Sequence, residues 1–103
     1  MTSKNQWMTT QVGELFEAFS KLENKREIAM FFRDVATMRE ITEMAGRWKA
    51  AQLLEEGKAY RFVSKKTGLS TATVTRVANW RREGEGGYKL LLKRLNKAHS
   101  HAH

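Results

Sequence analysis

Residues 60–79 read YRFVSKKTGLSTATVTRVAN and have the pattern of a helix-turn-helix, in which two short helices are joined by a tight turn. Gly68 stands where the turn needs a left-handed backbone, which costs other residues about 1 kcal/mol or more. Ser70 can cap the second helix by accepting a hydrogen bond from a backbone amide of the first turn. The positions that face inward and set the angle between the helices are apolar, namely Val63, Leu69, Val74 and Val77.

The outward face of the second helix carries short polar or methyl-bearing side chains and one long cation: Thr71, Ala72, Thr75, Arg76 and Asn79. Methyl groups of this kind can contact thymine methyls, and hydroxyls can reach bases or phosphates in a DNA major groove. The backbone amides at the start of the helix are available donors to a phosphate. This face therefore predicts binding to double-stranded DNA.

The net charge of +8 is concentrated around the same motif. Residues 58–82 hold seven Lys/Arg and no Asp/Glu, whereas residues 1–57 hold eight basic and nine acidic side chains. Such a block is typical of a surface that binds a polyanion. We expect Lys65, Lys66, Arg81 and Arg82 to neutralise DNA phosphates beside the second helix. A helical hairpin with an incidental, solvated basic face gives the same count and is the structural alternative.

Apolar residues at helical spacing continue on the N-terminal side of the motif. Helices are predicted from Val12 to Leu22, from a cap at Asn24 to Val35, and from a Thr37/Glu40 capping box to a C-terminal stop at Gly57. Their stripes contain many large side chains for short helices to bury. A second subunit would help to cover this surface, although an internal bundle could do the same.

A last helix is predicted on the C-terminal side, because Tyr88, Leu91, Leu92 and Leu95 repeat the helical spacing after Gly86-Gly87. Proline is absent and no strand pattern occurs, so the predicted fold class is all-α. The 103 residues suffice for one domain. We expect an N-terminal arm at 1–11, a single helical domain at 12–96 with the helix-turn-helix at 59–82, and a disordered tail at 97–103.

Several function classes are excluded by what the sequence lacks. Without cysteine there is no disulfide framework, thiolate metal site or cysteine nucleophile. The longest run without a charged residue is nine residues, too short for the roughly 17 to 25 apolar positions of a membrane span. The N-terminus has no secretory signal, so the expected location is the cytoplasm.

No arrangement of residues typical of catalysis is found. The GEGG at 84–87 follows no strand and is acidic, which indicates a linker and not a phosphate loop. The alternating histidines of the tail, His99, His101 and His103, could bind nickel or zinc but have no acidic neighbour, and either a native tail or a tag remnant would explain them. We expect no enzyme activity, no metal site and no cofactor.

The stretch 47–82 resembles the Trp repressor family, in particular its YerC/YecD-type branch. The matching pieces are LLEEG at 53–57, the turn glycine Gly68, and ATVTR at 72–76 followed by Asn79, and a resemblance of helix order extends back to about Leu15. The resemblance implies an all-helical, intertwined homodimer. Its two recognition helices would enter successive major grooves about 34 to 36 Å apart on a palindromic operator. It also implies that the protein represses transcription.

Some roles of single residues are implied by the family alone. An arginine early in the first helix of the motif contacts a guanine in the family, and Arg61 stands at that position. The residues that open the recognition helix correspond to Thr71, Ala72, Thr73 and Thr75. The full set of predicted DNA contacts is Arg61, Lys65, Lys66, Ser70, Thr71, Ala72, Thr73, Thr75, Arg76, Asn79, Arg81 and Arg82.

The namesake of the family also binds L-tryptophan, with the indole held between two arginines. Arg47 and Arg76 match these arginines, and Thr37 aligns with a threonine of that pocket. However, Val77 replaces the glycine beside the indole and Trp80 replaces a small hydroxyl residue, and overpacking of this kind typically costs about 1 to 3 kcal/mol. We therefore expect no tryptophan binding, and our hypothesis is that Val77 and Trp80 substitute for the corepressor.

Three alternatives stay open at this point. The protein could be an effector-dependent repressor that binds tryptophan or another small metabolite. It could instead be a basic helical adaptor or an RNA-binding protein, although exposed aromatic platforms for single-stranded RNA are few in the basic block. Finally, Arg47 could be purely structural and pair with Glu43 or Asp34 on the surface.

Overall fold

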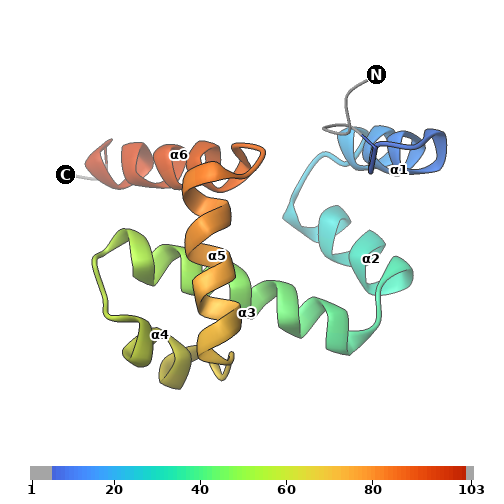
Figure 1. The fold of residues 1–103 in the computed structure, drawn as a ribbon. Coiled ribbons are helices and arrows are strands. Elements are labelled where there is room, and N and C mark those ends of the chain that lie inside the picture. Colours follow the sequence, from blue (N-terminus) through green and yellow to red (C-terminus); the bar gives the residue numbers. More distant parts are fainter. Residues whose placement is uncertain (1–5, 102–103) are drawn as a thin grey trace. The chain divides into compact units, whose positions relative to one another are not determined.

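The computed structural model describes residues 6–101, with side chains as far as residue 97. The described residues form helices and no strand, which confirms the predicted all-α fold class (Figure 1). None of these helices is both long and apolar enough to span a bilayer. The helices are α1 (Thr10–Ser20), α2 (Lys25–Val35), α3 (Met38–Glu55), α4 (Tyr60–Thr67), α5 (Thr71–Glu83) and α6 (Gly87–His101).

The chain divides into two compact units, unit 1 (Met1–Ile41) and unit 2 (Thr42–His103), and α3 runs across the boundary between them. The sequence predicts one domain over 12–96, which stays a prediction, and each unit is described here by itself. Neither α1 nor α2 contains a buried side chain.

Both ends of the helical region differ from the predicted boundaries. Thr9 caps α1 by accepting a hydrogen bond from the amide of Val12, so the helix begins inside the predicted N-terminal arm. At the other end, α6 continues to His101, beyond residue 97, where the predicted tail begins. No glycine or proline follows Leu95 to stop the helix. Residues 102–103 lie outside the described part of the chain.

The starts of α2 and α3 are those that the sequence predicts. The Asn24 side chain accepts a hydrogen bond from the Glu27 amide at 3.0 Å. Thr37 and Glu40 form the predicted capping box: the Thr37 amide donates to the Glu40 carboxylate at 2.8 Å, and the Glu40 amide donates to the Thr37 hydroxyl at 3.1 Å. These bonds satisfy amides that the first turn of a helix leaves without a partner.

Aromatic contacts hold unit 1 together. Phe19 stacks on Phe32 with ring centroids 5.0 Å apart, and meets Phe31 edge-on at 5.3 Å. On its other side Phe19 lies 6.1 Å from Phe16. Yet none of the described residues 6–41 is buried, and Phe16 keeps 41% of its surface exposed. Unit 1 thus has well-formed helices and a cluster of rings, but no enclosed core.

The core lies in unit 2 and takes side chains from four helices. Figure 1 shows α5 crossing α3, with α4 beside the start of α5 and α6 at its end. Val63, Val74 and Val77 have no exposed surface at all. The core also contains three alanines, Ala50, Ala51 and Ala78, whose small side chains leave room for close packing of the helices. The buried set is Ala50, Ala51, Leu53, Leu54, Val63, Val74, Val77, Ala78 and Leu92, with Leu69 packed against it.

Candidate nucleic-acid interface

The turn between α4 and α5 is fixed by its backbone and by two hydroxyls. Gly68 has φ of 80°, the left-handed conformation that the sequence predicts there. The Ser64 hydroxyl donates to the Leu69 carbonyl at 2.6 Å, and the Thr67 hydroxyl accepts from the Leu69 amide at 3.2 Å. Neither bond is predicted from the sequence. Serine and threonine hydroxyls often bond to backbone groups in turns, so the positions of Ser64 and Thr67 close to Gly68 could have indicated these bonds.

The start of α5 is capped as predicted. Ser70 accepts a hydrogen bond from the Thr73 amide at 3.1 Å. The first intrahelical bond runs from the Val74 amide to the Ser70 carbonyl, so the amides of Thr71 and Ala72 precede the helical hydrogen-bond ladder. Together with the partial positive charge of the helix start, these amides are suited to an anionic oxygen.

The two sides of α5 have opposite character. Val74, Val77 and Ala78 are buried in the core of unit 2. The residues predicted to face outward are all exposed, namely Thr71, Ala72, Thr75, Arg76 and Asn79, while Thr73 is half-buried. The predicted division into inward and outward positions is confirmed, and the contact of the outward positions with DNA stays a prediction.

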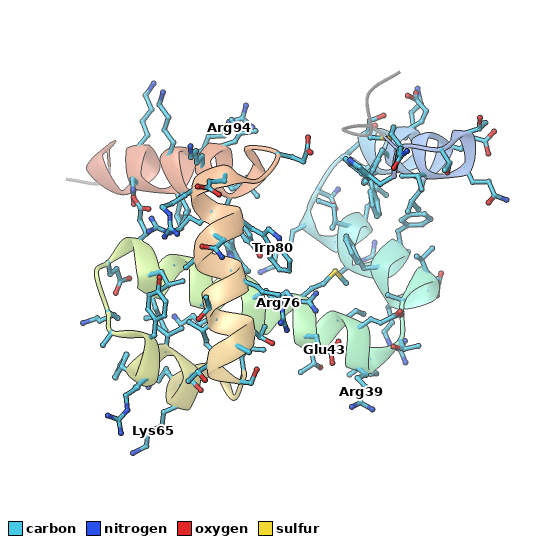
Figure 2. The ribbon with its side chains drawn as sticks, in the orientation of Figure 1. Arg39, Glu43, Lys65, Arg76, Trp80 and Arg94 are labelled. Atoms are coloured by element: carbon cyan, nitrogen blue, oxygen red, sulfur yellow. The ribbon has the colours of Figure 1, made fainter. Side chains whose placement is uncertain are left out.

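Hydrogen bonds within α5 and its first turn order the exposed face. The Arg76 guanidinium donates to the Thr73 hydroxyl at 2.9 Å, and the Thr75 hydroxyl donates to the Thr71 carbonyl at 3.0 Å. In the last turns Arg82 donates to the Asn79 side-chain oxygen at 2.7 Å. Figure 2 shows Arg76 and Trp80 leaving the same flank of α5. These short-range bonds hold polar groups at fixed places on the surface.

Exposed cations lie on both helices of the motif. Lys65 and Lys66 are in the last turn of α4, and Figure 2 shows Lys65 at that end, pointing away from α5. Arg61, in the first turn of α4, and Arg82, in the last turn of α5, are also exposed. No acidic side chain occurs between residues 58 and 82 to offset them. The structure therefore gives the helix-turn-helix an electropositive surface.

Arg81 differs in its surroundings from the other predicted phosphate contacts, whose contact with DNA stays a prediction as its own does. Its guanidinium Nη1 lies 2.7 Å from Oε1 of Glu55, at the end of α3, and only 24% of the side chain is exposed. Its Nε is buried and has no hydrogen-bond partner among the described residues. Arg81 follows Val74 by seven positions and Val77 by four, so it belongs to the inward side of the helix. The structure separates it from the exposed cations.

The residues matched to a tryptophan pocket differ in their burial and in their contacts. Val77 is fully buried among core side chains, and Arg76 is bonded to Thr73 within α5. Arg47 is half-buried, and its Nε has no hydrogen-bond partner among the described residues. Thr37 belongs to unit 1 and serves in the capping box.

Trp80 is not enclosed by neighbouring side chains, and its predicted role in place of a corepressor stays a prediction. It is 45% exposed and borders an open cavity of about 580 Å³. Trp48 and Tyr88 stack there with ring centroids 6.3 Å apart. Burial raises the pKa of Tyr88 above its ordinary value near 10.0, and the charge of Arg47 opposes this rise. The cavity is lined by Trp48, Trp80, Glu83, Gly84, Glu85, Gly87, Tyr88 and Leu91.

No group of three or more His, Asp or Glu side chains that could hold a metal ion occurs among the described residues. The side chains of His99, His101 and His103 lie beyond residue 97, so the structure does not describe them.

Comparison with known proteins assigns the fold and the family. The Trp repressor protein family matches residues 10–96. The chain is 33% identical over 87 residues to the uncharacterized protein YerC of Bacillus subtilis (strain 168), which covers 84% of each chain. A TrpR-like protein from Eubacterium eligens ATCC 27750 is 37% identical, with a TM-score of 0.82 over 89% of this chain and 95% of that one.

A candidate Trp repressor from Staphylococcus aureus is 31% identical and superimposes with a TM-score of 0.83, over 93% of this chain and 96% of the other. These similarities confirm the resemblance that ATVTR and the turn glycine indicate in the sequence. Proteins of this type are regulators and not enzymes. The chain therefore belongs to the Trp repressor family, and α4 and α5 are its helix-turn-helix.

Proposed function

We propose that this protein is a sequence-specific, double-stranded DNA-binding regulator that represses transcription as a homodimer in the cytoplasm. One observation carries the proposal: α5 buries Val74 and Val77 on one side and exposes short polar side chains on the other. A helix with its side chains is about 10 to 12 Å across, and the DNA major groove is about 12 Å wide. The exposed side of α5 therefore suits this groove.

The exposed residues divide into two roles. The exposed side of α5 carries short side chains that can reach base edges, namely Thr71, Ala72, Thr75 and Asn79. Lys65, Lys66 and Arg82 lie at the ends of the two helices and can neutralise backbone phosphates, which adds affinity for any sequence. Arg61 takes the guanine-contacting position of the family.

The proposal is tested by a salt titration on duplexes that the protein selects from a random pool. If about six phosphates are neutralised, the logarithm of the binding constant falls with the logarithm of salt at a slope near −5. Single-stranded RNA of the same sequence is the matched control. Preferential binding of duplex with this slope supports the proposal. Equal affinity for RNA, or a slope near zero, overturns it in favour of an RNA-binding or adaptor role.

The homodimer rests on apolar surface that neither unit covers. Phe16 and Met30 of unit 1 are 41% and 54% exposed, and Leu91 beside the cavity of unit 2 is 52% exposed. Large clusters of exposed apolar residues mark interaction surfaces. A second copy of the chain also supplies the second recognition helix that a palindromic site requires. Sedimentation equilibrium should give twice the 11.9 kDa of one chain, and a monomer at all concentrations contradicts this part of the proposal.

We further propose that L-tryptophan is not required. Val77 is enclosed by the core, and the Arg76 guanidinium is bonded to Thr73, so neither offers an open place to an indole. Calorimetry with L-tryptophan should give no saturable heat. Saturable binding that also tightens affinity for the selected duplex would reject this point and favour an effector-dependent repressor.

A further inference from the structure

Arg81 is held in a position that separates it from every other cation of the basic block. Successive residues of a helix are rotated by about 100°, so neighbours face different directions. Arg82 is exposed and bonded to Asn79 on the outward face, whereas Arg81 lies with Val74, Val77 and Ala78 on the inward face. Its guanidinium is bonded to Glu55, and 24% of its side chain stays exposed.

Glu55 is the last residue of α3, and the last turn of α3 contains no basic residue. The carbonyl groups at the end of a helix carry partial negative charge, so a carboxylate there is unfavourable unless a cation is near. Arg81 supplies that cation from the last turn of α5 at 2.7 Å, a bond between residues 26 apart in sequence. The pair ties the C-terminal ends of α3 and α5 together.

The rest of α5 is held by the core nearer to its start. Val74 and Val77 are fully buried, and the Ser70 cap fixes the first turn. Ala78 is buried as well and α5 contacts α6, and the Arg81–Glu55 pair adds a bond between the last turn of α5 and α3. We propose that the Arg81–Glu55 pair is a positioning device that sets the angle of α5 and thereby the sequence preference of the DNA-binding face. This inference rests on the proposed function.

The two possible roles of Arg81, binding a phosphate or positioning α5, predict opposite changes in DNA affinity when the Glu55 carboxylate is removed. If Arg81 binds a phosphate, removing the nearby Glu55 carboxylate frees Arg81 and removes a repulsive charge, so DNA binding tightens. If Arg81 positions α5, removing the carboxylate releases the helix end, so binding to the preferred sequence weakens. Glu55→Gln therefore separates the two roles without touching a cation.

The test compares Arg81→Gln, Glu55→Gln and the double variant of the full chain, with Arg82→Gln as the matched control. The probes are a duplex of about 30 base pairs selected by the wild type and a scrambled duplex of equal composition. Both single variants should weaken binding to the selected duplex about 5-fold, and the double variant should be no worse than either. Affinity for the scrambled duplex should change less than about 2-fold.

The salt slope gives a second readout. Arg81→Gln should leave it unchanged, whereas Arg82→Gln should lower it by about one. The inference is overturned if Glu55→Gln tightens binding to both duplexes or changes neither affinity. A parallel loss on both duplexes with a lower slope for Arg81→Gln overturns it as well. If Arg81→Gln loses its helical circular dichroism, the sign of the Glu55→Gln effect still decides.

Hydrogen exchange in the free protein measures whether the Arg81–Glu55 pair holds the end of α5, and this result does not depend on DNA binding. Loss of the pair should speed exchange of the last amides of α5 about 5-fold in Arg81→Gln and Glu55→Gln, but not in Arg82→Gln. If exchange is faster in Arg81→Gln and Glu55→Gln but the wild type binds no duplex preferentially, the proposed function is contradicted, whereas the role of the Arg81–Glu55 pair in holding the end of α5 is supported. Unchanged exchange would contradict that role, whatever the protein binds.

Discussion

Unit 1 and the helix-turn-helix of unit 2 have equally clear signals in their sequences, yet only unit 2 has a core. Asn24 and Ser70 cap their helices with the same type of bond, at 3.0 and 3.1 Å. In unit 2 the valines of α4 and α5 are fully buried, while the phenylalanines of unit 1 cluster but stay partly exposed. Local sequence therefore decides where a helix begins, and burial depends on what a second element brings to its apolar side.

The largest expected effect is in the core of unit 2. Leu54→Ala removes a buried side chain of α3 and should lower the free energy of unfolding by about 3 kcal/mol. Urea denaturation at fixed protein concentration measures it, and Lys49→Ala on the exposed side of the same helix should change stability by less than about 0.5 kcal/mol. A Leu54→Ala loss as small as that of Lys49→Ala would show that unit 2 has no closed core.

A change in unit 1 should weaken dimer association by about 2 kcal/mol of free energy. Phe16→Glu places a charge on the exposed ring cluster and should weaken the proposed dimer about 30-fold. Sedimentation at micromolar concentration should then detect single chains. Glu14→Gln, exposed on the same helix, should leave the mass of two chains unchanged. An unchanged mass for Phe16→Glu would mean that the aromatic cluster is not part of the interface.

Substitutions of two cations of the helix-turn-helix should affect different properties, the sequence preference for Arg61 and the affinity for all sequences for Lys66. Arg61→Ala should cost about 1 to 3 kcal/mol of binding and relax the preference at one base pair, because its proposed partner is a base. Lys66→Ala should cost less and weaken all sequences alike, since its proposed partner is a phosphate. Binding measured on a set of single-substitution duplexes separates the two. Equal effects of both variants on every duplex would refute the role of Arg61.

The smallest pair of effects has opposite signs in the two units. Gly68 has φ of 80° with no atom within 4 Å of an added Cβ, so Gly68→Ala should destabilise by about 1 kcal/mol through backbone strain alone. Gly13 lies inside α1, also in open space, so Gly13→Ala should stabilise by up to about 1 kcal/mol. Thermal denaturation compares them. A gain for Gly68→Ala would contradict the left-handed turn.

Features that depend on neighbours in sequence could be predicted. The caps at Asn24, Thr37 and Ser70 need only residues three positions away, and the turn at Gly68 needs a single glycine between two helical patterns. The outward face of α5 follows from helical periodicity, and its exposure is confirmed. For the same reason the family resemblance was visible in ATVTR.

Features that join distant parts of the chain could not be predicted. Arg81 looks like Arg82 in the sequence, and only the geometry of α3 relative to α5 brings Glu55 to it. The cavity beside Trp80 likewise depends on Trp48 and Tyr88, which are 40 positions apart. The lack of buried side chains in α1 and α2 could not be predicted either, because apolar spacing predicts an apolar face without showing what covers it.

Chemical-shift mapping can show whether the exposed face of α5 binds duplex DNA. Amide signals of the ¹⁵N-labelled protein would be followed as the selected duplex is added. We expect the largest changes over residues 71–76 and at Lys65 and Lys66, with small changes in α1 and α2. Changes centred on the aromatic cluster of unit 1, or on the cavity beside Trp80 with α5 unaffected, would contradict this expectation.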